Sequence, residues 1–280
     1  MRYVALLFLL VGLLPLLKAE SLPVVMKGSD TLGAKLVPRL IQAYQADGKD
    51  LRFEIAAEGS STAFTHLLED PTGIGMASRP IKVEERARFE KAGLQLTEHV
   101  AAFDMMAIVV HETQPIESLS LRQIESIFTS EVTNWSEVGG ADLPIAVYTR
   151  NTSSGTYKTF QRLAMRGRPY GETTQKMAGG GLHLHETSKN AAGITYVGLA
   201  YTQAEGIKVL EIDNVFPKPE NQSIYRLARP LYFYTTARAS PEALEFLRWA
   251  GDSETAGRIV EQVGFIRVRP DLTSQPMKSK

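Results

Sequence analysis

One unit occurs three times in this sequence: a short apolar stretch, a turn rich in Ser, Thr and Gly, and an amphipathic segment directly after it. The turns lie at 29–31, 59–62 and 153–156. Short apolar strands that alternate with amphipathic helices indicate an α/β fold. Ligands of such folds bind in the crevice at the carboxyl ends of the strands, so we expect the three turns to converge there.

Apolar runs, helical periodicity and the intervening turns predict the individual elements. We expect strands at 22–26, 51–57, 74–77, 105–110, 145–149, 194–197, 232–235 and 265–268. We expect helices at 32–45, 63–69, 84–92, 121–128, 157–165 and 241–249. Segment 217–221 is loop-like, and we place a chain crossing near it.

The N-terminus is typical of a secretory signal peptide, residues 1–19. A short basic start precedes an almost continuously apolar run at 4–17, and Lys18-Ala19-Glu20 ends it. A membrane anchor is the alternative, but the run is shorter than the roughly 20 residues that span a bilayer. We expect cleavage near Ala19 and a mature protein that is periplasmic or secreted.

Composition excludes several functional classes. Lys plus Arg and Asp plus Glu each number 31, so the basic surplus typical of nucleic-acid binding is absent. The 280 residues contain no cysteine, which excludes a thiolate metal site, a cysteine nucleophile and a lipid anchor on Cys. His183 and His185 alternate as on one face of a strand, but no third metal ligand stands at a usual spacing. We expect no metal and no cofactor.

The three turns have the chemistry of an oxyanion site. Backbone N–H groups at a helix start have no partner within the helix and lie at the positive end of its dipole. Such a terminus binds oxyanions, and hydroxyls add further donors. Each turn alone is more often just an N-cap, but three in one chain favour a shared ligand. Arg150 directly precedes the third turn, where it is either an oxyanion ligand or a surface arginine.

Six motifs occur in order over nearly all of the chain that follows the signal peptide. They are Gly28-Ser29-Asp30-Thr31, Glu58-Gly59-Ser60-Ser61, Ala77-Ser78-Arg79-Pro80-Ile81, Ile127-Phe128 with Thr133-Asn134-Trp135, Arg150 with Ser153-Ser154-Gly155-Thr156, and Gly193-Ile194-Thr195-Tyr196-Val197. In these motifs the sequence resembles the phosphate-binding proteins of bacterial ABC transporters, especially their shorter, divergent branch.

The resemblance implies an α/β, two-lobed periplasmic-binding-protein fold of type II, with mixed sheets flanked by helices and the ligand in the interlobe cleft. We expect one lobe from 20–102 and 230–280, the other from 103–229, and hinges near 99–103 and 225–230. The implied function is capture of inorganic phosphate for an ABC transporter permease by a monomer that is not an enzyme. The expected ligand-binding residues are Ser29, Asp30, Thr31, Leu32, Ser60, Ser61, Ser78, Arg79, Arg150, Ser153, Ser154, Gly155 and Thr156.

Two positions depart from the pattern of that family. Ser78 stands where well-known members carry an Asp that accepts the proton of hydrogen phosphate, and a hydroxyl can donate as well as accept. Arg79 beside it is a second candidate cation, and Asp30 is either an N-cap or the replacement acceptor. The segment 151–153 replaces an Ala-Asp-Gly whose Asp pairs with the cleft arginine, so Arg150 has another partner or none.

Three other functions stay open. The loss of the Asp at position 78 favours a binding protein for another oxyanion, such as sulfate or molybdate. A secreted phosphatase or serine hydrolase is the enzymatic alternative, but no G-x-S-x-G elbow and no recognisable triad or metal cluster is present. A scaffold or sensor that kept the fold and lost the ligand is the third.

Overall fold

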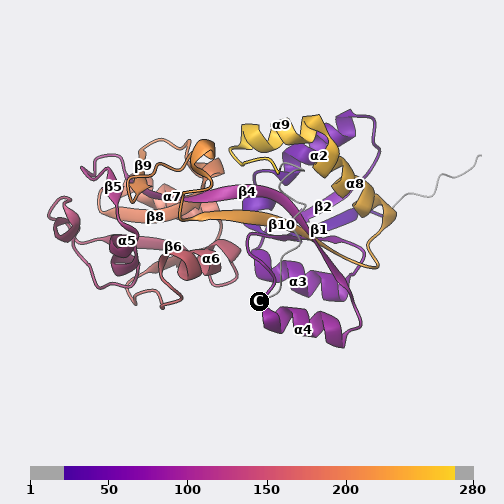
Figure 1. Ribbon diagram of the computed structural model, residues 1–280, viewed down its shortest axis with the longest axis horizontal. Helices are drawn as coiled ribbons and strands as arrows, with labels where there is room; N and C mark the ends of the chain where they lie inside the picture. The colour runs from indigo at the N-terminus through magenta and orange to yellow at the C-terminus, as the bar shows by residue number, and fades with distance from the viewer. Residues whose placement is uncertain (1–21, 269–280) are drawn as a thin grey trace, which may run out of the picture.

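Two lobes lie side by side in the computed structural model, which describes residues 22–268 (Figure 1). Two neighbouring strands join them: β4 (Leu96–His111) and β10 (Ala228–Thr236). They pair antiparallel, with Ala228 opposite Met105 and Thr236 opposite Leu96. The signal peptide predicted for residues 1–19 lies outside the described residues.

The strands of both lobes form mixed sheets. The first lobe has the order β2 (Phe53–Ala56), β1 (Val24–Gly28), β3 (Ile74–Ala77), β10 and β4, with β1 parallel to both of its neighbours. The second continues from β4 through β8 (Gly193–Gly198) and β6 (Ala146–Arg150) to β7 (Gln175–Met177). There β9 (Ile207–Ile212) also pairs with β4, and β5 (Ser118–Leu119) pairs with β9.

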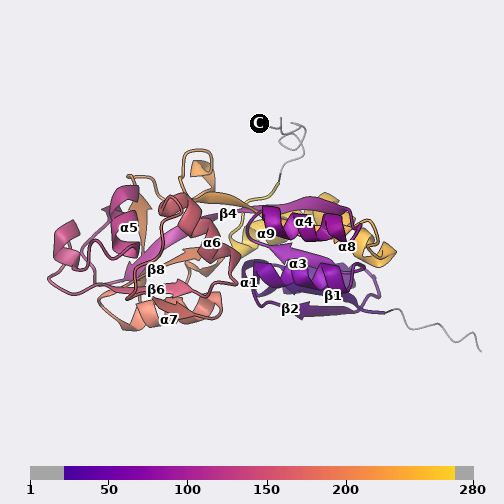
Figure 2. The same ribbon diagram turned by 90° about the horizontal axis from the view of Figure 1, so that it is seen from below.

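Helices cover both faces of each sheet. In the first lobe α2 (Val37–Ala46), α8 (Pro241–Asp252) and α9 (Glu254–Val263) lie on one face, and α3 (Ser60–Glu69) and α4 (Val83–Lys91) on the other (Figure 1). In the second lobe α5 (Leu121–Phe128) and α6 (Gly155–Ala164) lie opposite α7 (Gly180–Lys189) (Figure 2). The four-residue helix α1 (Asp30–Gly33) faces the second lobe.

Each lobe has its own hydrophobic core. One large cluster of buried residues runs from Met105 to Leu227 in the sequence and includes Trp135, whose Nε1 donates to the carbonyl of Ala192 at 2.9 Å. Another is formed by residues 24–102 and 231–265. Two smaller clusters lie on the opposite faces, under α3 and α4 and under α7. Continuous apolar strands such as β3 and β8 are buried on both faces, as parallel strands between helix layers usually are.

Two local expectations are wrong, those for 265–268 and for the two histidines. Residues 265–268 form an isolated bridge, Phe103 to Ile266, rather than a strand. Segment 217–221 contains a short 3-10 turn, Pro219–Asn221, and the joining strand β10 begins at Ala228. His183 and His185 lie on α7, where one is buried and the other exposed, so they do not share a face. Within residues 22–268, no helix combines the length and the apolar character needed to cross a membrane.

A candidate anion site between the two lobes

The three predicted turns meet where the lobes touch. Thr31, from the first turn, and Thr156, from the third, have their Oγ1 atoms 3.2 Å apart. Gly155 lies directly against the second turn, because a Cβ atom placed on it would be 2.2 Å from Ser60 Oγ and 2.6 Å from Ser78 Oγ. The expectation of convergence is confirmed, and the third turn comes from the opposite lobe to the other two.

Short backbone bonds hold the first-lobe part of the site together. The N–H of Ser29 donates to the carbonyl of Met76, and the N–H of Gly59 donates to the carbonyl of Gly28. Gly28 has φ +133°, and a Cβ there would lie 2.1 Å from the Met76 oxygen, so this turn requires glycine. The first and second turns are thereby fixed beside the end of β3.

Ser60 and Ser78 form a hydroxyl pair at this place. Ser60 Oγ accepts from the N–H of Ser78 at 2.9 Å and lies 3.2 Å from Ser78 Oγ. Both residues are buried. Because each hydroxyl can donate or accept, the pair can adapt to an anion whether or not that anion carries a proton.

The third turn is bonded across the lobe boundary. Ser153 Oγ lies 3.1 Å from the carbonyl of Glu58, and the N–H of Ser61 donates to the carbonyl of Ser153 at 3.3 Å. Ser154 caps α6, since its Oγ accepts from the N–H of Tyr157. These contacts describe lobes that are closed on each other.

The guanidinium of Arg79 is occupied by another residue. It donates to the two carboxylate oxygens of Glu85 at 2.7 and 2.6 Å, and to Ser61 Oγ at 3.3 Å. Both partners of the ion pair are buried. A bidentate pair of this kind uses one edge of the guanidinium, so Arg79 is first a brace between β3 and α4 and is not the free second cation that the sequence indicated.

Arg229 on β10 reaches the site from the strands that join the lobes. Its Nε and Nη2 donate to Asp104 Oδ2 at 3.1 and 2.8 Å, and the two side chains are almost fully buried. Its Nη1 donates to Thr156 Oγ1 at 2.9 Å and lies 3.3 Å from the carbonyl of Ser78. This arginine therefore contacts a turn of each lobe.

Arg150 has a partner, and it is Asp30. Arg150 Nη1 donates to Asp30 Oδ2 at 3.1 Å, across the lobe boundary. Asp30 is the first residue of α1, while Ser29 holds the N-cap position, so Asp30 is not an N-cap. Among the described residues, each of the three buried arginines of the site is thus balanced by a carboxylate.

Several donors of the site nevertheless lack an acceptor. Six buried side-chain polar atoms have no hydrogen-bond partner among the described residues, and three of them lie here: Ser29 Oγ, Arg79 Nε and Arg150 Nε. A buried group left in this state costs about 1–3 kcal/mol. Buried donors without an acceptor are expected where the oxygens of a bound anion complete the hydrogen bonds.

A buried imidazole lies behind Arg150. Burial and the nearby Arg150 charge lower the pKa of His183 to about 3. Thr195 Oγ1 donates to the carbonyl of Tyr148, so it accepts from Nδ1–H of His183 at 2.9 Å. His183 is therefore neutral, and its hydrogen bond to Thr195 holds α7 in place. Within residues 22–268, no group of three or more His, Cys, Asp or Glu is arranged to hold a metal.

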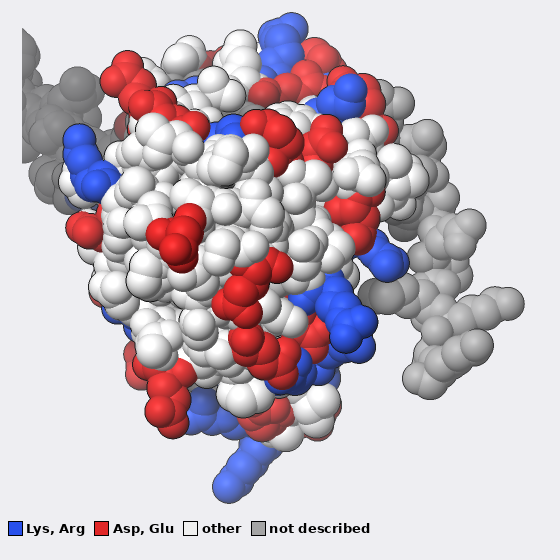
Figure 3. Space-filling model, turned by 90° about the vertical axis from the view of Figure 1, so that its left-hand side faces the viewer, with Lys and Arg blue, Asp and Glu red and all other residues white. Residues whose placement is uncertain are grey.

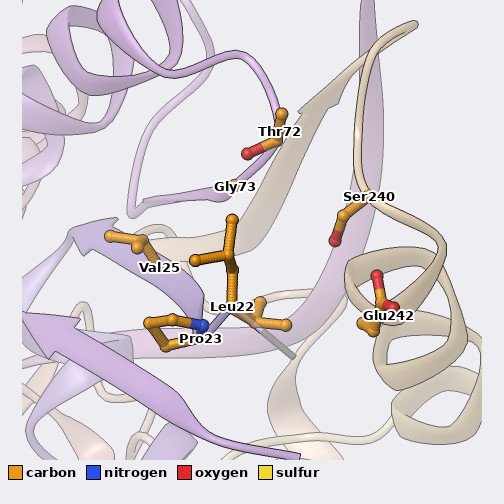
Figure 4. A pocket seen from close by; sticks show the side chains of 8 residues that line it. Leu22, Pro23, Val25, Thr72, Gly73, Ser240 and Glu242 are labelled. Atoms are coloured by element: carbon orange, nitrogen blue, oxygen red, sulfur yellow. The ribbon is translucent and has the colours of Figure 1, made fainter. Parts of the chain in front are cut away.

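Other hollows of the surface lack this chemistry. One pocket of about 260 Å³ lies at the start of β1, far from the turns, and Figure 4 shows that mainly apolar and hydroxyl side chains line it, with Glu242 as the charged one. The end of the second lobe shows Asp and Glu scattered among uncharged residues, with smaller groups of Lys and Arg (Figure 3). No charge of one sign covers that face.

The comparison with known families agrees with this site. Residues 18–254 match the model of the PBP superfamily domain. The chain belongs to the PBP superfamily. The matched range includes all three turns and both strands that join the lobes.

Several PBP-superfamily relatives are similar over most of their length. The phosphate-binding protein PstS of Pseudomonas aeruginosa PAO1 is 28% identical over 276 residues, which cover 90% of this chain and 84% of that protein. PstS of Bacillus subtilis 168 is 27% identical over 236 residues, with coverages of 83% and 77%. A phosphate ABC transporter substrate-binding protein from Clostridium perfringens, solved with bound phosphate, is 30% identical with a TM-score of 0.81, and covers 88% of this chain and 100% of its own.

The thirteen residues predicted from the sequence differ in their burial. The side chain of Leu32 is fully buried in the core of the first lobe and packs there with other apolar residues. Ser29, Thr31, Ser60, Ser78, Ser154, Gly155 and Thr156 are buried at the meeting point of the lobes.

Four residues that bond to the predicted ones or to one another were not predicted: Glu85, Asp104, Arg229 and Tyr201, whose hydroxyl donates to Asp30 Oδ2 at 3.2 Å. Two of them left a signal in the sequence, because Asp104 and Arg229 are lone charges within apolar strands. An isolated charge in a buried strand needs a partner of opposite sign. Glu85 and Tyr201 lie in ordinary helical contexts and left no such signal.

Proposed function

We propose that this chain is an exported solute-binding protein that captures inorganic phosphate between its lobes and delivers it to the permease of an ABC transporter. The observation that carries the proposal is the meeting of three turns around buried donors that lack an acceptor. A tetrahedral oxyanion offers four acceptor atoms within a small radius, which suits donors that converge from several directions. The phosphate bound to the similar Clostridium perfringens protein supports phosphate as this anion.

In this proposal the ligand is held between closed lobes. We place the boundaries at 102/103 and 229/230, within β4 and β10, which bend as hinges near 99–103 and 225–230. Arg229 supports this role, because it lies on a joining strand and contacts the third turn and Ser78 together. Small-angle scattering that shows no compact form with saturating phosphate argues against closure.

The proposed ligand contacts are the donors that face the turns. Ser29, Thr31, Ser60, Ser78 and Thr156 supply hydroxyls, Leu32 and Gly155 supply backbone N–H groups, and Arg150 supplies its free Nε edge. The remaining predicted residues, Asp30, Ser61, Arg79, Ser153 and Ser154, position these groups. Binding by fixed dipoles suits a site whose arginines are already balanced by carboxylates.

Calorimetry on the mature protein from Glu20 onward tests the proposal. Phosphate, arsenate, sulfate and molybdate are titrated separately at pH 6 and pH 8. Phosphate is expected to bind with micromolar or tighter affinity, and absence of binding at millimolar phosphate refutes the proposal. Release of inorganic phosphate from phosphate esters above background, abolished by one serine substitution, would instead make the chain an enzyme.

We place the mature chain in the periplasm or outside the cell as a monomer without cofactor, metal or nucleic acid. Non-enzymatic binding is supported by the site serines, because none of Ser29, Ser60, Ser78 and Ser154 has a histidine within hydrogen-bonding distance among the described residues. A hydrolase of the serine type requires that contact.

A second candidate ligand is a fully ionised oxyanion such as sulfate or molybdate. The observation that favours it is the Ser60–Ser78 hydroxyl pair, which does not impose a negative charge where the ligand would need a proton. The same calorimetric series separates the two ligands, because sulfate carries no proton at pH 6 or pH 8 while phosphate carries one or two.

A further inference from the structure

Asp30 makes an unusual set of contacts for a residue of the first lobe. Its Oδ2 accepts from Arg150 Nη1 at 3.1 Å, from the N–H of Gly180 at 2.9 Å and from the hydroxyl of Tyr201 at 3.2 Å. The three donors come from β6, from the start of α7 and from the turn at Leu199–Tyr201. All of them belong to the second lobe, so one carboxylate oxygen holds three of its elements.

The second lobe supplies no carboxylate of its own to Arg150. The turn that follows Arg150 reads Asn151-Thr152-Ser153, and Asp30 is the carboxylate that pairs with this arginine among the described residues. The Arg150 and Asp30 side chains are 5% and 13% exposed. A guanidinium buried to this extent without a counter-ion is strongly unfavourable, so the closed arrangement needs Asp30 or another anion in that place.

Two neighbouring features fit around this carboxylate. A Cβ on Gly180 would lie 3.1 Å from Asp30 Oδ2 and 3.0 Å from the Tyr201 ring, which is tighter than an ordinary contact, so a glycine suits this close approach. Lys35 of the first lobe places its Nζ 4.5 Å from the centre of the Tyr201 ring. Tyr201 is therefore held by two residues of the opposite lobe, which strengthens the same closure.

The pairing leaves room for a ligand. Asp30 uses Nη1 of Arg150, while Nε of Arg150 is buried and without a partner. The guanidinium can thus hold Asp30 through one group and an anion through another. By contrast, the Arg229–Asp104 pair joins neighbouring residues of β10 and β4, which stay adjacent when the lobes move.

We infer that Asp30 is a latch between the lobes: it stands in for the anion at Arg150, so that the ligand-free protein is largely closed with Arg150 already oriented. Asp30 is a positioning residue in this scheme. The inference rests on the proposed function for its purpose, but its test measures lobe spacing without ligand. A protein that is mostly open without ligand binds more weakly, because part of the binding free energy is used to close the lobes. The latch reduces this loss, because it favours the closed form before the ligand binds.

The absence of cysteine in the chain allows a direct measurement of lobe spacing. Glu54 on β2 and Glu186 on α7 are exposed, and both elements lie on the side of the molecule away from β4 (Figure 2). Cysteines at these two positions carry nitroxide labels, and pulsed electron paramagnetic resonance gives their distance distribution. The side away from the joining strands is where hinge opening separates the lobes most.

In the ligand-free protein we expect one dominant short distance. Asp30→Ala should add a longer distance and lower the closed-to-open ratio at least about tenfold, the equivalent of one charge-assisted hydrogen bond. Asp30→Asn, which keeps the shape and loses the charge, should shift the ratio in the same direction by less. Asp70→Ala is the matched control, because the carboxylate of Asp70 accepts hydrogen bonds from Thr72 of its own lobe, and it should leave the distribution unchanged.

Several results overturn the latch. It is wrong if the ligand-free parent is already as open as Asp30→Ala, or if Asp30→Ala and Asp30→Asn both stay as closed as the parent. A change as large in Asp70→Ala also overturns it, because carboxylate loss in general is then the cause. If the Asp30 variants open as expected but phosphate neither binds nor closes them, the latch stands and the proposed ligand is wrong.

Discussion

A single methyl group on Gly155 should prevent the lobes from closing. Gly155 is the first residue of α6 and has a helical conformation, which alanine adopts without strain. The three nearest atoms to the added Cβ all belong to the first lobe: Ser60 Oγ at 2.2 Å, Ser78 Oγ at 2.6 Å and Ser60 Cβ at 2.9 Å. Gly155→Ala therefore leaves each lobe intact and acts only on the contact between them.

The size of the effect follows from these distances. An ordinary contact of a Cβ begins at 3.4 Å, so the lobes must separate by roughly 1 Å at this point to accept the methyl group. Hydrogen bonds to a ligand held from both sides then become too long to count. Loss of two charge-assisted bonds, at about 1.5–3 kcal/mol each, weakens binding by about 3–6 kcal/mol, or about 10²- to 10⁴-fold in Kd.

Calorimetry with phosphate measures this loss, and thermal unfolding without ligand checks that the variant is folded. Gly181→Ala is the control, because Gly181 also lies in the first turn of a helix and has no atom within 4 Å of the added Cβ. Gly181→Ala should bind as the parent does. A Gly155→Ala protein that binds within about threefold of the parent would show that the turns do not close on the ligand as described.

Three further predictions concern single side chains. Arg150→Ala should weaken phosphate binding by about 2–3 kcal/mol, or roughly 10²-fold, whereas His185→Ala on the exposed face of α7 should not change it; calorimetry distinguishes them. Ser78→Asp should raise the ratio of phosphate to sulfate affinity, because a carboxylate repels an anion without a proton; an unchanged ratio contradicts this role of position 78. The pKa of His183 is about 3 in the folded protein and about 6.5 in the unfolded chain. The contribution of neutral His183 to the free energy of unfolding is therefore complete above pH 6.5 and is lost as the pH falls. Urea unfolding gives the free energy of unfolding at pH 7 and at pH 4.5. Between these values His183→Gln should lose about 2–3 kcal/mol less of this free energy than the parent, and equal losses count against a buried neutral imidazole.

Local sequence signals sufficed for the elements that hold the three turns. The strands that end at Gly28, Ala56 and Arg150 are short, mostly apolar and followed within four residues by small polar residues, so strand, turn and helix were all visible within a short stretch of sequence. The family resemblance then placed the turns in one cleft. The prediction of an anion site depended on this agreement between local chemistry and topology.

Helix α7 shows where local signals fail. Gly179-Gly180-Gly181 reads as a flexible turn, and the alternating Leu-His-Leu-His after it reads as a strand. In the structure its first N–H is held by Asp30 of the other lobe, and Leu184 packs in the cluster beneath it. Tertiary contacts thus stabilise a helix whose glycines and alternating pattern disfavour one.

The carboxylate partners of the arginines divide into those that the sequence could and could not reveal. Asp104 and Arg229 interrupt two apolar strands, and burial of either charge alone would be prohibitive, so a reader who expects those strands to be neighbours can infer the pair. Asp30 and Arg150 are separated by 120 positions and each lies beside a turn, where water can solvate a charge in the open form. Nothing local requires them to meet. Their contact exists only because the lobes close, and for that reason it reports on closure in a way that the Asp104–Arg229 pair cannot.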